Sequence, residues 1–349
     1  MDNVRIERVY TMDQTNLKKY KNFLTNQNLE FEEPIDVLYA AFDDEKIVAT
    51  GALSGQIIKM MSIDPTFRGT NLIGQLLSEI MNYAFQMGQD HLFIYTKPEY
   101  HDTFIHLGFY QICMTDHVAL FENRPEGFNR YISEIRGKLE NVSGSIGAVV
   151  MNCNPFTLGH QHLIEVASAE VDTLIVFVLS EDKSTFPSDV RMRLVRAGTA
   201  HLNNVVVCET GPYMVSAATF PSYFLNEGHA KVQVQTELDA KLFGQKISKK
   251  LGITKRFLGE EPFSPTTEVY NNSLQETLKQ FDVDVKIIQR KSINTEVISA
   301  SKVRNYIAQD KEELAYLLVP ESTREFLMSD AASSIIDKLK SEAHLIKRV

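Results

Sequence analysis

The amino-acid sequence predicts an α/β fold built from two domains. The chain has 349 residues, which is longer than a single hydrophobic core usually supports. From residue 145 onward, short β-type runs alternate with helical stretches, and this alternation is typical of βαβ units on a parallel sheet. Residues 1–123 instead contain a strand, a helix and then several strands in succession, which is the pattern of an α+β domain. We therefore expect domains at 1–123 and 145–349, joined by a linker helix at 124–144.

The first domain begins with a strand and a helix, after which three β-type runs follow one another: IDVLYAAFDD, EKIVATGALSG and QIIKMMSIDP. The next stretch, FRGTNLIGQLLSEIMNYAFQMG, repeats apolar residues at i, i+4 in two adjacent rows. These rows are Leu72, Leu76, Ile80 and Ala84, and Ile73, Leu77, Met81 and Phe85. Two such rows describe an amphipathic helix packed on a sheet. The domain closes with a strand (HLFIYTKPE), a short helix (HDTFIHLGF) and a pair of strands (YQICMTDHVALFEN).

A change of composition marks the linker. Pro125, Gly127, Gly137 and Gly144 surround a charged helical stretch within NRPEGFNRYISEIRGKLENVSGS. Because proline and glycine interrupt regular elements, we expect a helix that ends near Gly144.

The second domain alternates strands and helices. The strand SIGAVVM precedes a helix from about Gln161, and the runs DTLIVFVLS, DVRMRLVRAGTAHL and NVVVCET then read as strand, helix and strand. After KVQVQTE come a Lys-rich helix (DAKLFGQKISKKLG), a strand (KRFLGEE), a helix (NNSLQETLKQF) and a strand (VDVKIIQR). This order predicts parallel strands joined by crossover helices.

Composition excludes several classes of protein. The formal net charge is −9 and neither half of the chain is basic, so no nucleic-acid partner is expected. No apolar run approaches the ~20 residues of a membrane span, and the first residues lack the features of a secretory signal. Cys113, Cys153 and Cys208 are far apart and odd in number, so they predict neither a disulfide framework nor a zinc site. We expect a cytoplasmic protein that does not bind membranes.

The stretch NCNPFTLGH at 152–160 follows the first strand of the second domain and leads into a helix. In open parallel sheets, ligands bind beyond the carboxyl ends of the strands, and a helix N-terminus there favours phosphate. Pro155 fixes the turn, Gly159 permits close approach of the backbone, and Thr157 and His160 can face one ligand. The alternative is that Thr157 only caps the helix, Gly159 only forms a turn and His160 lies at the surface.

This stretch resembles the His/Thr-x-Gly-His signature of the nucleotidyltransferase superfamily, whose members use a Rossmann-like domain for attack on the α-phosphate of ATP. The second signature of that superfamily, Ile-Ser-Ser-Thr-x-x-Arg, is similar to ISASKVRNYI at 298–307. Ser301 at the start of a helix is expected to cap it, although Ala300 departs from the usual Ser. The resemblance implies ATP contacts by Asn154, Phe156, Thr157, Gly159, His160, Ser299, Ser301 and Arg304, and catalysis by His160 and Arg304.

The second domain also resembles the C-terminal domain of the citrate lyase ligase family over about residues 145–345. TELDAKLFG at 236–244, RFLGEEPFSPTTEVYN at 256–271 and ISASKVR carry this resemblance in order. Within the second stretch, the pair Glu260-Glu261 could hold Mg²⁺, contact adenosine or only cap the loop, and the sequence leaves these roles open.

The first domain is similar to the GNAT acetyltransferase superfamily in its order of elements and in LGFY at 107–110. Citrate lyase ligases carry such a domain before the nucleotidyltransferase domain. The pyrophosphate loop of the superfamily, Arg/Gln-x-x-Gly-x-Gly/Ala, aligns with FRGTNLIGQLL, in which Arg68 and Gly69 fit the pattern. Asn71 and Ile73 stand where loop glycines are usual, and a β-branched residue does not readily take a left-handed conformation.

We therefore expect weak binding of acetyl-CoA by this loop. A modified role, in which Arg68, Gly69, Asn71 and Gly74 hold a CoA-like arm, is one hypothesis. A purely structural role of the domain is the other.

The resemblance to citrate lyase ligases implies a two-step reaction. ATP, with Mg²⁺ bridging its phosphates, would activate acetate as acetyl-AMP and release pyrophosphate. The acetyl group would then pass to the thiol of the CoA-like prosthetic group on the citrate lyase acyl carrier subunit, which activates citrate lyase. His160 and Arg304 would stabilise the first transition state. No metal-ligating residues of the protein are expected, and Cys153 reads as a buried cysteine without a catalytic role.

Three other functions stay open from the sequence. An adenylyltransferase that joins AMP to a phosphorylated metabolite, such as pantetheine phosphate, shares both nucleotide motifs but needs no GNAT-like domain. An N-acetyltransferase with an accessory nucleotide domain conflicts with the altered loop at Asn71 and Ile73. A nucleotide-sensing regulator without turnover conflicts with the presence of both motifs.

Overall fold

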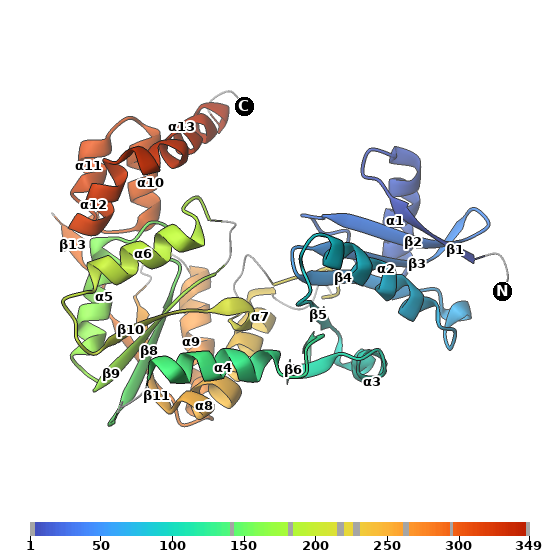
Figure 1. The fold of residues 1–349 in the computed structure, drawn as a ribbon, viewed down its shortest axis with the longest axis horizontal. Helices are drawn as coiled ribbons and strands as arrows, with labels where there is room; N and C mark the ends of the chain where they lie inside the picture. Colours follow the sequence, from blue (N-terminus) through green and yellow to red (C-terminus); the bar gives the residue numbers. More distant parts are fainter. Residues whose placement is uncertain are drawn as a thin grey trace. The chain divides into compact units, whose positions relative to one another are not determined.

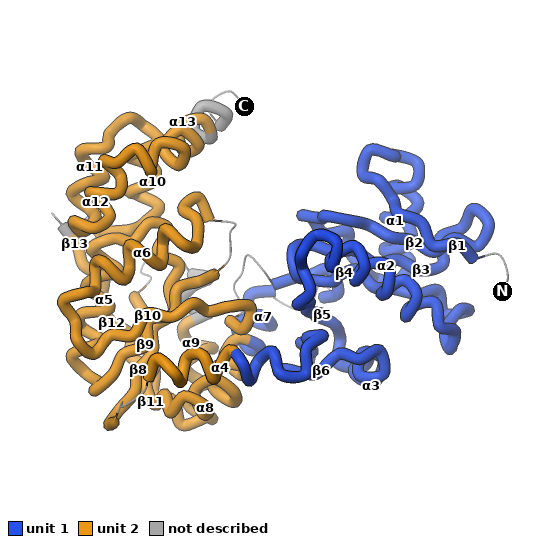
Figure 2. The backbone as a smooth tube through the Cα atoms, in the orientation of Figure 1, with its two compact units in different colours: residues 1–130, 219–238 blue, residues 131–218, 239–349 orange. Residues whose placement is uncertain are grey.

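The structure of the chain is a computed structural model (Figure 1). It describes residues 4–139, 143–180, 184–214, 220–225, 231–260, 265–293 and 296–346. Glu261, whose role the sequence leaves open, lies outside the described residues. The chain divides into two compact units (Figure 2): unit 1 is residues 1–130 with 219–238, and unit 2 is residues 131–218 with 239–349. The domain limits at 123 and 145 stay a prediction from the sequence.

Unit 1 is built on a mixed sheet. Among its described residues, seven strands lie in the order β1-β2-β3-β4-β5-β7-β6, and only β4 and β5 are parallel neighbours. The strands are β1 Val4–Val9, β2 Val37–Asp43, β3 Lys46–Ser54, β4 Ile57–Ile63, β5 Phe93–Thr96, β6 Tyr110–Met114 and β7 Ala119–Glu122. The α-helices are α1 Gln14–Asn26, α2 Leu72–Gln86 and α3 His101–His106, and α4 Gly127–Lys138 follows them across the limit of the unit. Short 3₁₀ turns occupy Pro65–Phe67 and Pro98–Tyr100.

Helix α2 packs on this sheet as its periodicity predicts. All four residues of the row that begins at Leu72 are buried, whereas Phe85 of the second row is 74% exposed. The helix lies close to β3, because a Cβ added to Gly51 would meet Met61 Sδ at 2.5 Å and Ile80 Cδ1 at 2.7 Å. The apolar stripe of the helix is therefore narrower than the two rows suggest.

Unit 2 contains a parallel sheet whose described strands lie in the order β10-β9-β8-β11-β12. The strands are β8 Ile146–Met151, β9 Thr173–Val178, β10 Val205–Glu209, β11 Ile253–Gly259 and β12 Asp284–Ile288, with a separate pair β13 Ser292–Ile293 and β14 Glu296–Val297. Numbered along the chain, the five parallel strands follow the order 3-2-1-4-5 of a Rossmann-like sheet. The order reverses between β8 and β11, and this switch point is where such sheets bind ligands.

The helices of unit 2 begin with α5 Leu158–Ser168 and α6 Ser188–Gly198. Helix α7 Lys231–Leu242 crosses the limit between the units, and a π-helix Phe243–Ser248, α8 Lys249–Leu251 and α9 Pro265–Lys279 follow it. Helices α10 Ala300–Ala308, α11 Glu312–Tyr316, α12 Glu321–Leu327 and α13 Ser333–Ile346 follow, and Figure 1 shows them gathered at one end of the unit. The 3₁₀ turns Gly211–Tyr213 and Asp330–Ala332 complete the set.

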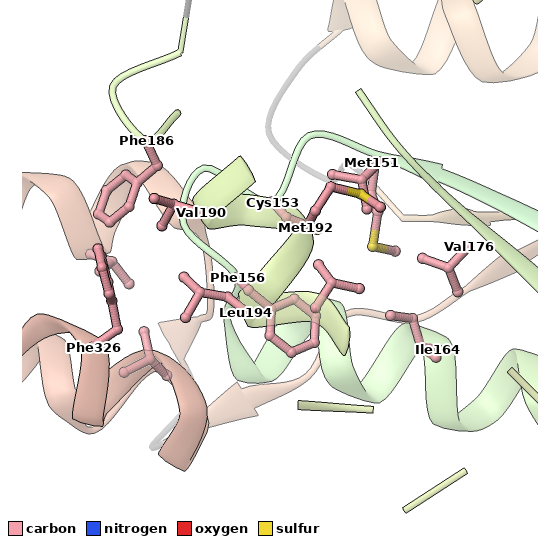
Figure 3. Packing of buried hydrophobic residues seen from close by; sticks show 14 of the residues in the cluster. Met151, Cys153, Phe156, Ile164, Val176, Phe186, Val190, Met192, Leu194 and Phe326 are labelled. Carbon is pink, nitrogen blue, oxygen red and sulfur yellow. The ribbon is translucent and has the colours of Figure 1, made fainter. Parts of the chain in front are cut away.

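A buried apolar cluster joins the sheet of unit 2 to its helices (Figure 3). Phe186 and Phe326 meet at a ring-centroid distance of 6.4 Å, and Phe156 lies beside Leu194 within the same cluster. Strand β9 is buried along its whole length, as expected for a central strand covered on both faces.

The α/β class with a mixed first sheet and a parallel second sheet is confirmed.

Candidate active site

The stretch 152–160 and the start of α10 meet at the switch point of the parallel sheet. A cavity of about 420 Å³ lies there. Its walls come from the carboxyl ends of β8, β11 and β12, from the start of α5 and from the start of α10. Five residues expected at an ATP site line it: Thr157, Gly159, His160, Ser299 and Ser301. Two segments 140 residues apart in the sequence therefore share one cavity, as the two motifs predict.

Thr157 is the N-cap of α5, and its cap differs from the usual pattern in one residue. The Thr157 hydroxyl accepts a hydrogen bond from the His160 N–H at 3.3 Å. The His160 ring returns the interaction, because its Nδ1 accepts from the Thr157 N–H at 3.1 Å. His160 thus occupies the position that Glu or Gln holds in a capping box.

This cap fixes the proton on the His160 ring. A backbone N–H can only donate, so Nδ1 must accept and the neutral ring carries its hydrogen on Nε2. Burial and, to a smaller extent, the positive charge of Arg290 together lower the pKa of His160 to about 4. Near pH 7 the ring is therefore neutral and has one N–H, at Nε2, to donate to a ligand. The capping and functional readings of Thr157 and His160 are compatible, since one nitrogen serves each.

Gly159 packs closely against the second motif. A Cβ added at this position would lie 3.3 Å from the Ile298 carbonyl oxygen and 3.6 Å from the Ile298 Cβ. The absence of a side chain therefore allows the first turn of α5 to lie against the residue that precedes Ser299.

Helix α10 supplies the second set of groups. Ser299 is its N-cap and accepts from the Lys302 N–H at 3.2 Å. The expectation that Ser301 caps this helix is wrong, because Ser301 lies inside the first turn. Its hydroxyl instead accepts from the Arg304 guanidinium at 3.1 Å.

Arg304 also bonds to the first motif. Its second terminal nitrogen donates to the Asn154 carbonyl oxygen, and burial lowers the pKa of the half-buried guanidinium. Arg304 and Asn154 thus lie together at the edge of the cavity rather than among its lining residues. Phe156 is fully buried and stacks on the His160 ring, with centroids 6.0 Å apart. The ATP contacts expected of these residues stay predictions.

Arg191 fixes the loop between β8 and α5 through hydrogen bonds to its backbone and to one of its side chains. It is fully buried and donates to the Asn152 carbonyl and side-chain oxygens and to the carbonyls of Phe186 and Leu179. Asn152 itself lines the cavity. Neither residue is found by sequence reasoning, because only the fold brings Arg191 on α6 beneath the loop.

Arg290 is a further cavity residue that the motifs do not reveal. It follows β12 at the carboxyl edge of the sheet, and its Nε donates to the Glu260 carbonyl oxygen at 2.6 Å. The Glu260 N–H in turn donates to the Ile288 carbonyl, so the end of β11 is tied to the end of β12. The sequence carried one signal for this residue, which is the charged end of the run VDVKIIQR.

Cys153 lies in the loop between β8 and α5, but its thiol is not available for a reaction. It is buried, its backbone takes a left-handed φ of 54°, and burial raises the pKa of its thiol. A thiol that does not ionise is a poor nucleophile.

The loop at residue 68 of unit 1 contains Gly69, which has a left-handed φ of 83°. Asn71 instead has φ −80° and precedes α2, and Ile73 lies in the first turn of that helix. Neither Asn71 nor Ile73 has the left-handed conformation that a loop glycine would permit, and weak acetyl-CoA binding by this loop stays a prediction. Gly74 packs on Asn71, since an added Cβ would lie 2.6 Å from its Oδ1.

Two kinds of feature are absent from the residues that the structure describes. No helix in this part of the chain is long and apolar enough to cross a membrane. No group of three or more His, Cys, Asp or Glu side chains is arranged there to hold a metal ion.

Two of the matches cover only part of the chain. A phosphopantetheine adenylyltransferase from Rhodopirellula baltica is 41% identical over 68 residues, which are 19% of this chain and 38% of that protein. An acyl-CoA N-acyltransferase from Pseudomonas aeruginosa aligns with 35% of this chain and 99% of its own, at 15% identity and a TM-score of 0.30.

A family model, and two relatives that each match nearly the whole chain, carry the same name. The family model described as citrate lyase ligase C-terminal domain matches residues 146–327. The citrate (pro-3S)-lyase ligase of Haemophilus influenzae is 36% identical over 331 residues, covering 93% of this chain and 98% of that protein. The ligase of the same name from Escherichia coli strain K12 is 35% identical, covering 92% and 93%. The chain belongs to the citrate lyase ligase family.

Proposed function

We propose that this enzyme uses ATP to activate acetate as acetyl-AMP and then acetylates the prosthetic-group thiol of the citrate lyase acyl carrier subunit. The relatives are named as ligases that act on citrate lyase, and this supports citrate lyase as the target. Acetate, ATP with its Mg²⁺ and the carrier thiol are the substrates that the proposal adds.

The observation that carries the proposal is the convergence of two capped helix N-termini on one cavity at the switch point. Thr157 caps α5 and Ser299 caps α10, and both residues line the cavity. Helix N-termini present backbone N–H groups and a positive dipole end, which favour phosphate. Arg290 and Arg304 add two guanidinium groups beside them. A polyanion such as a triphosphate fits this charge distribution.

In the first step, a carboxylate oxygen of acetate attacks the α-phosphorus of ATP. The bond from phosphorus to the bridging oxygen breaks, and pyrophosphate leaves with the electron pair. Negative charge grows on the non-bridging oxygens, and the Nε2–H of neutral His160 donates to one of them. Arg304 neutralises charge on the phosphate chain. Catalysis of this kind rests on positioning and charge stabilisation, and it needs no nucleophile from the protein.

In the second step, the thiolate of the carrier arm attacks the carbonyl carbon of acetyl-AMP. The bond between that carbon and the AMP oxygen breaks, so AMP leaves and a thioester remains on the carrier. Cys153 takes no part, because its buried thiol stays protonated.

An adenylyltransferase is the second candidate, and the match of 68 residues to a phosphopantetheine adenylyltransferase favours it. That match covers only 19% of the chain, whereas the ligases match over 92% or more of it. The two reactions share the attack on the α-phosphorus and differ in the nucleophile, which is acetate or a phosphate ester.

Exchange of labelled pyrophosphate into ATP separates the two candidates. We expect exchange that depends on acetate and is unaffected by pantetheine phosphate, because acetyl-AMP formation is reversible. Exchange that ignores acetate and responds to pantetheine phosphate would identify the adenylyltransferase instead. A second assay follows labelled acetate onto the isolated carrier subunit, which only the ligase reaction acetylates.

A further inference from the structure

Strands β4 and β5 of unit 1 separate soon after they begin. They pair as parallel neighbours at only two positions, Ile57 with Phe93 and Ile58 with Ile94, although both strands continue. Beyond this point the backbones of Met60 on β4 and Tyr95 on β5 lie on the two sides of a gap. Both residues are buried, and buried backbone polar groups need partners.

A residue from far along the chain fills this gap. The Tyr223 hydroxyl donates to the Tyr95 carbonyl oxygen at 3.1 Å. The same hydroxyl accepts a hydrogen bond from the Met60 N–H. One phenol therefore bridges a donor on β4 and an acceptor on β5. Tyr223 is 4% exposed, and burial raises the pKa of its hydroxyl, so it stays a neutral donor.

The segment 220–225 is fastened on both sides of this tyrosine. The Glu32 carboxylate accepts from the Ser222 N–H at 2.6 Å and from the Ser222 hydroxyl at 3.0 Å. Its other oxygen lies 3.5 Å from the buried Lys59 ammonium on β4. The Glu30 N–H donates to the Tyr223 carbonyl. Hydrogen bonds therefore hold the backbone of Tyr223 as well as its hydroxyl.

Aromatic contacts add to this anchoring. Phe220 meets Tyr95 edge to face at 5.9 Å, and Phe224 meets Tyr223 edge to face at 5.1 Å. Phe220 and Phe224 are each 3% exposed. The segment is thus part of the core of unit 1.

A cleft of about 630 Å³ lies next to the gap between β4 and β5 that Tyr223 fills. Tyr223 and Phe224 form part of its wall, together with residues of the diverging ends of β4 and β5 and the loop that contains Arg68 and Gly69. The loop end of the cleft carries an exposed Arg68, whereas the gap between the strands is occupied by the phenol.

We propose that Tyr223 is a built-in occupant of the gap between β4 and β5, and that it closes the inner end of this cleft to acyl groups. An acyl group that entered between the strands would collide with the Tyr223 phenol, whose hydroxyl already bonds to the Met60 N–H and the Tyr95 carbonyl. Unit 1 therefore does not transfer acetyl groups from acetyl-CoA. This inference goes beyond the proposed function, and it means that the acetyl group of the ligase reaction passes only through the cavity of unit 2.

Calorimetric titration of the full-length protein with acetyl-CoA tests this inference. Replacing Tyr223 with Ala empties the gap and frees the Met60 N–H, so we expect Tyr223→Ala to bind acetyl-CoA at least ~10-fold more tightly than the wild type. Tyr100→Ala is the matched control, because Tyr100 lines the same cleft at its exposed side and does not bridge the strands. It should leave the affinity unchanged.

Equal affinity of wild type and Tyr223→Ala, or acetylation of an amine by the wild type, would overturn the proposal. Hydrogen exchange of the wild type gives a second measurement that needs no variant. The Ser222 and Glu30 amides should stay protected when acetyl-CoA is added at millimolar concentration. Loss of their protection would show that the acyl donor displaces the segment, and the inference would then be wrong.

Discussion

His160 combines two tasks in one ring, and the division between its nitrogens decides how a substitution acts. Nδ1 closes the cap of α5, and Nε2 carries the hydrogen that is left to donate to a ligand. Glutamine is a natural partner in a capping box, so its side-chain oxygen can replace Nδ1 as acceptor from the Thr157 N–H. We therefore expect His160→Gln to fold as the wild type does and to lose ~10²–10³ in acetate-dependent pyrophosphate exchange.

His160→Ala should lose the same turnover and also about 1 kcal/mol of stability, because it removes the cap as well. Urea denaturation measures the second loss. A folded His160→Gln protein with near-wild-type exchange would exclude His160 from the transition state.

The depressed pKa of His160 also predicts how stability depends on pH. The folded protein binds the imidazole proton near pH 4, whereas an unperturbed histidine binds it near pH 6.5. Between these values the unfolded chain binds more protons, so the free energy of unfolding falls as the pH decreases from about 6.5 toward 4. Urea denaturation at about pH 7.5 and pH 5 should show a larger loss for the wild type than for His160→Gln. Equal losses would mean that another group titrates.

Arg290 and Arg304 stand beside the same cavity but act differently on His160. The charge of Arg290 lowers the pKa of His160, whereas Arg304 donates to the Ser301 hydroxyl and the Asn154 carbonyl. Arg290→Met should therefore raise the His160 pKa, and Arg304→Met should leave it unchanged. Two-dimensional NMR of the imidazole during a pH titration measures both. Each variant should weaken exchange, since each removes one positive charge near the phosphates.

A rise of the His160 pKa in both variants would show that general opening of the site, and not the charge of Arg290, keeps the ring neutral. Lys286→Met provides a control for a distant charge, because Lys286 pairs with Glu170 at the surface. It should change neither the pKa nor the exchange rate.

At the scale of elements, the position of the loop between β8 and α5 depends on how α6 packs against it. Gly198 is the last residue of α6, and a Cβ there would lie 2.4 Å from Phe156 Cε1. Phe156 is fully buried and its carbonyl accepts from the Thr323 hydroxyl, so the ring cannot easily move aside. We expect Gly198→Ala to cost about 1–3 kcal/mol through overpacking and to lower exchange, because Phe156 stacks on His160.

Gly137→Ala is the matched control for this substitution. Gly137 lies in α4, and a Cβ there meets nothing within 4 Å. Alanine favours the helix, so this variant should gain up to about 1 kcal/mol. Thermal or urea denaturation of the two variants measures the contrast. A Gly198→Ala protein as stable as the wild type would show that Phe156 can move away from the added methyl group with little loss of stability.

Periodicity predicts most of the elements because they bury one face. The row from Leu72 to Ala84 and the continuous run of β9 are examples in which local pattern and final burial agree. The parallel pairing of the strands in unit 2 also follows from the alternation of strands and helices, and the stretch at 152–160 lies at the carboxyl end of β8, as the sequence predicts. These features of the fold follow from patterns between residues that are close in the sequence.

Other features depend on contacts that no local pattern carries. The run KVQVQTE alternates apolar and polar residues, yet it lies in helix α7, which begins at Lys231. The helices after α10 were not predicted, and they hold the loop through the Leu318 carbonyl, which accepts from the Leu158 N–H. Arg290 enters the cavity only because β12 lies beside β11.

The whole molecule is interleaved along its sequence, since residues 219–238 belong to unit 1 and their neighbours on both sides belong to unit 2. The run FPSYFL at 220–225 reads as a loop between a strand and a helix, and its aromatic residues give no sign that their partners lie near residues 30 and 95. A protein that lacks residues 1–130 would therefore keep the aromatic segment 220–225 and lose the residues of unit 1 that cover it.

This interleaving predicts the behaviour of a chain that begins at residue 131. Each aromatic side chain buries roughly 150–250 Å², so uncovering Phe220, Tyr223 and Phe224 exposes an apolar patch as large as the largest found on typical monomers. We expect residues 131–349 to aggregate and to bind a hydrophobic dye. The same chain with all three aromatics replaced by Ser should be more soluble, and size-exclusion chromatography at matched concentration measures the difference.

The soluble serine variant should also keep acetate-dependent pyrophosphate exchange, because every residue that lines the cavity of unit 2 lies within 131–349. It should not acetylate the carrier if unit 1 positions the arm through the loop at Arg68. Aggregation of both proteins to the same extent would show that the uncovered aromatics are not the cause. A soluble chain with its aromatics intact would show that the uncovered patch does not drive aggregation, and the prediction would then be wrong.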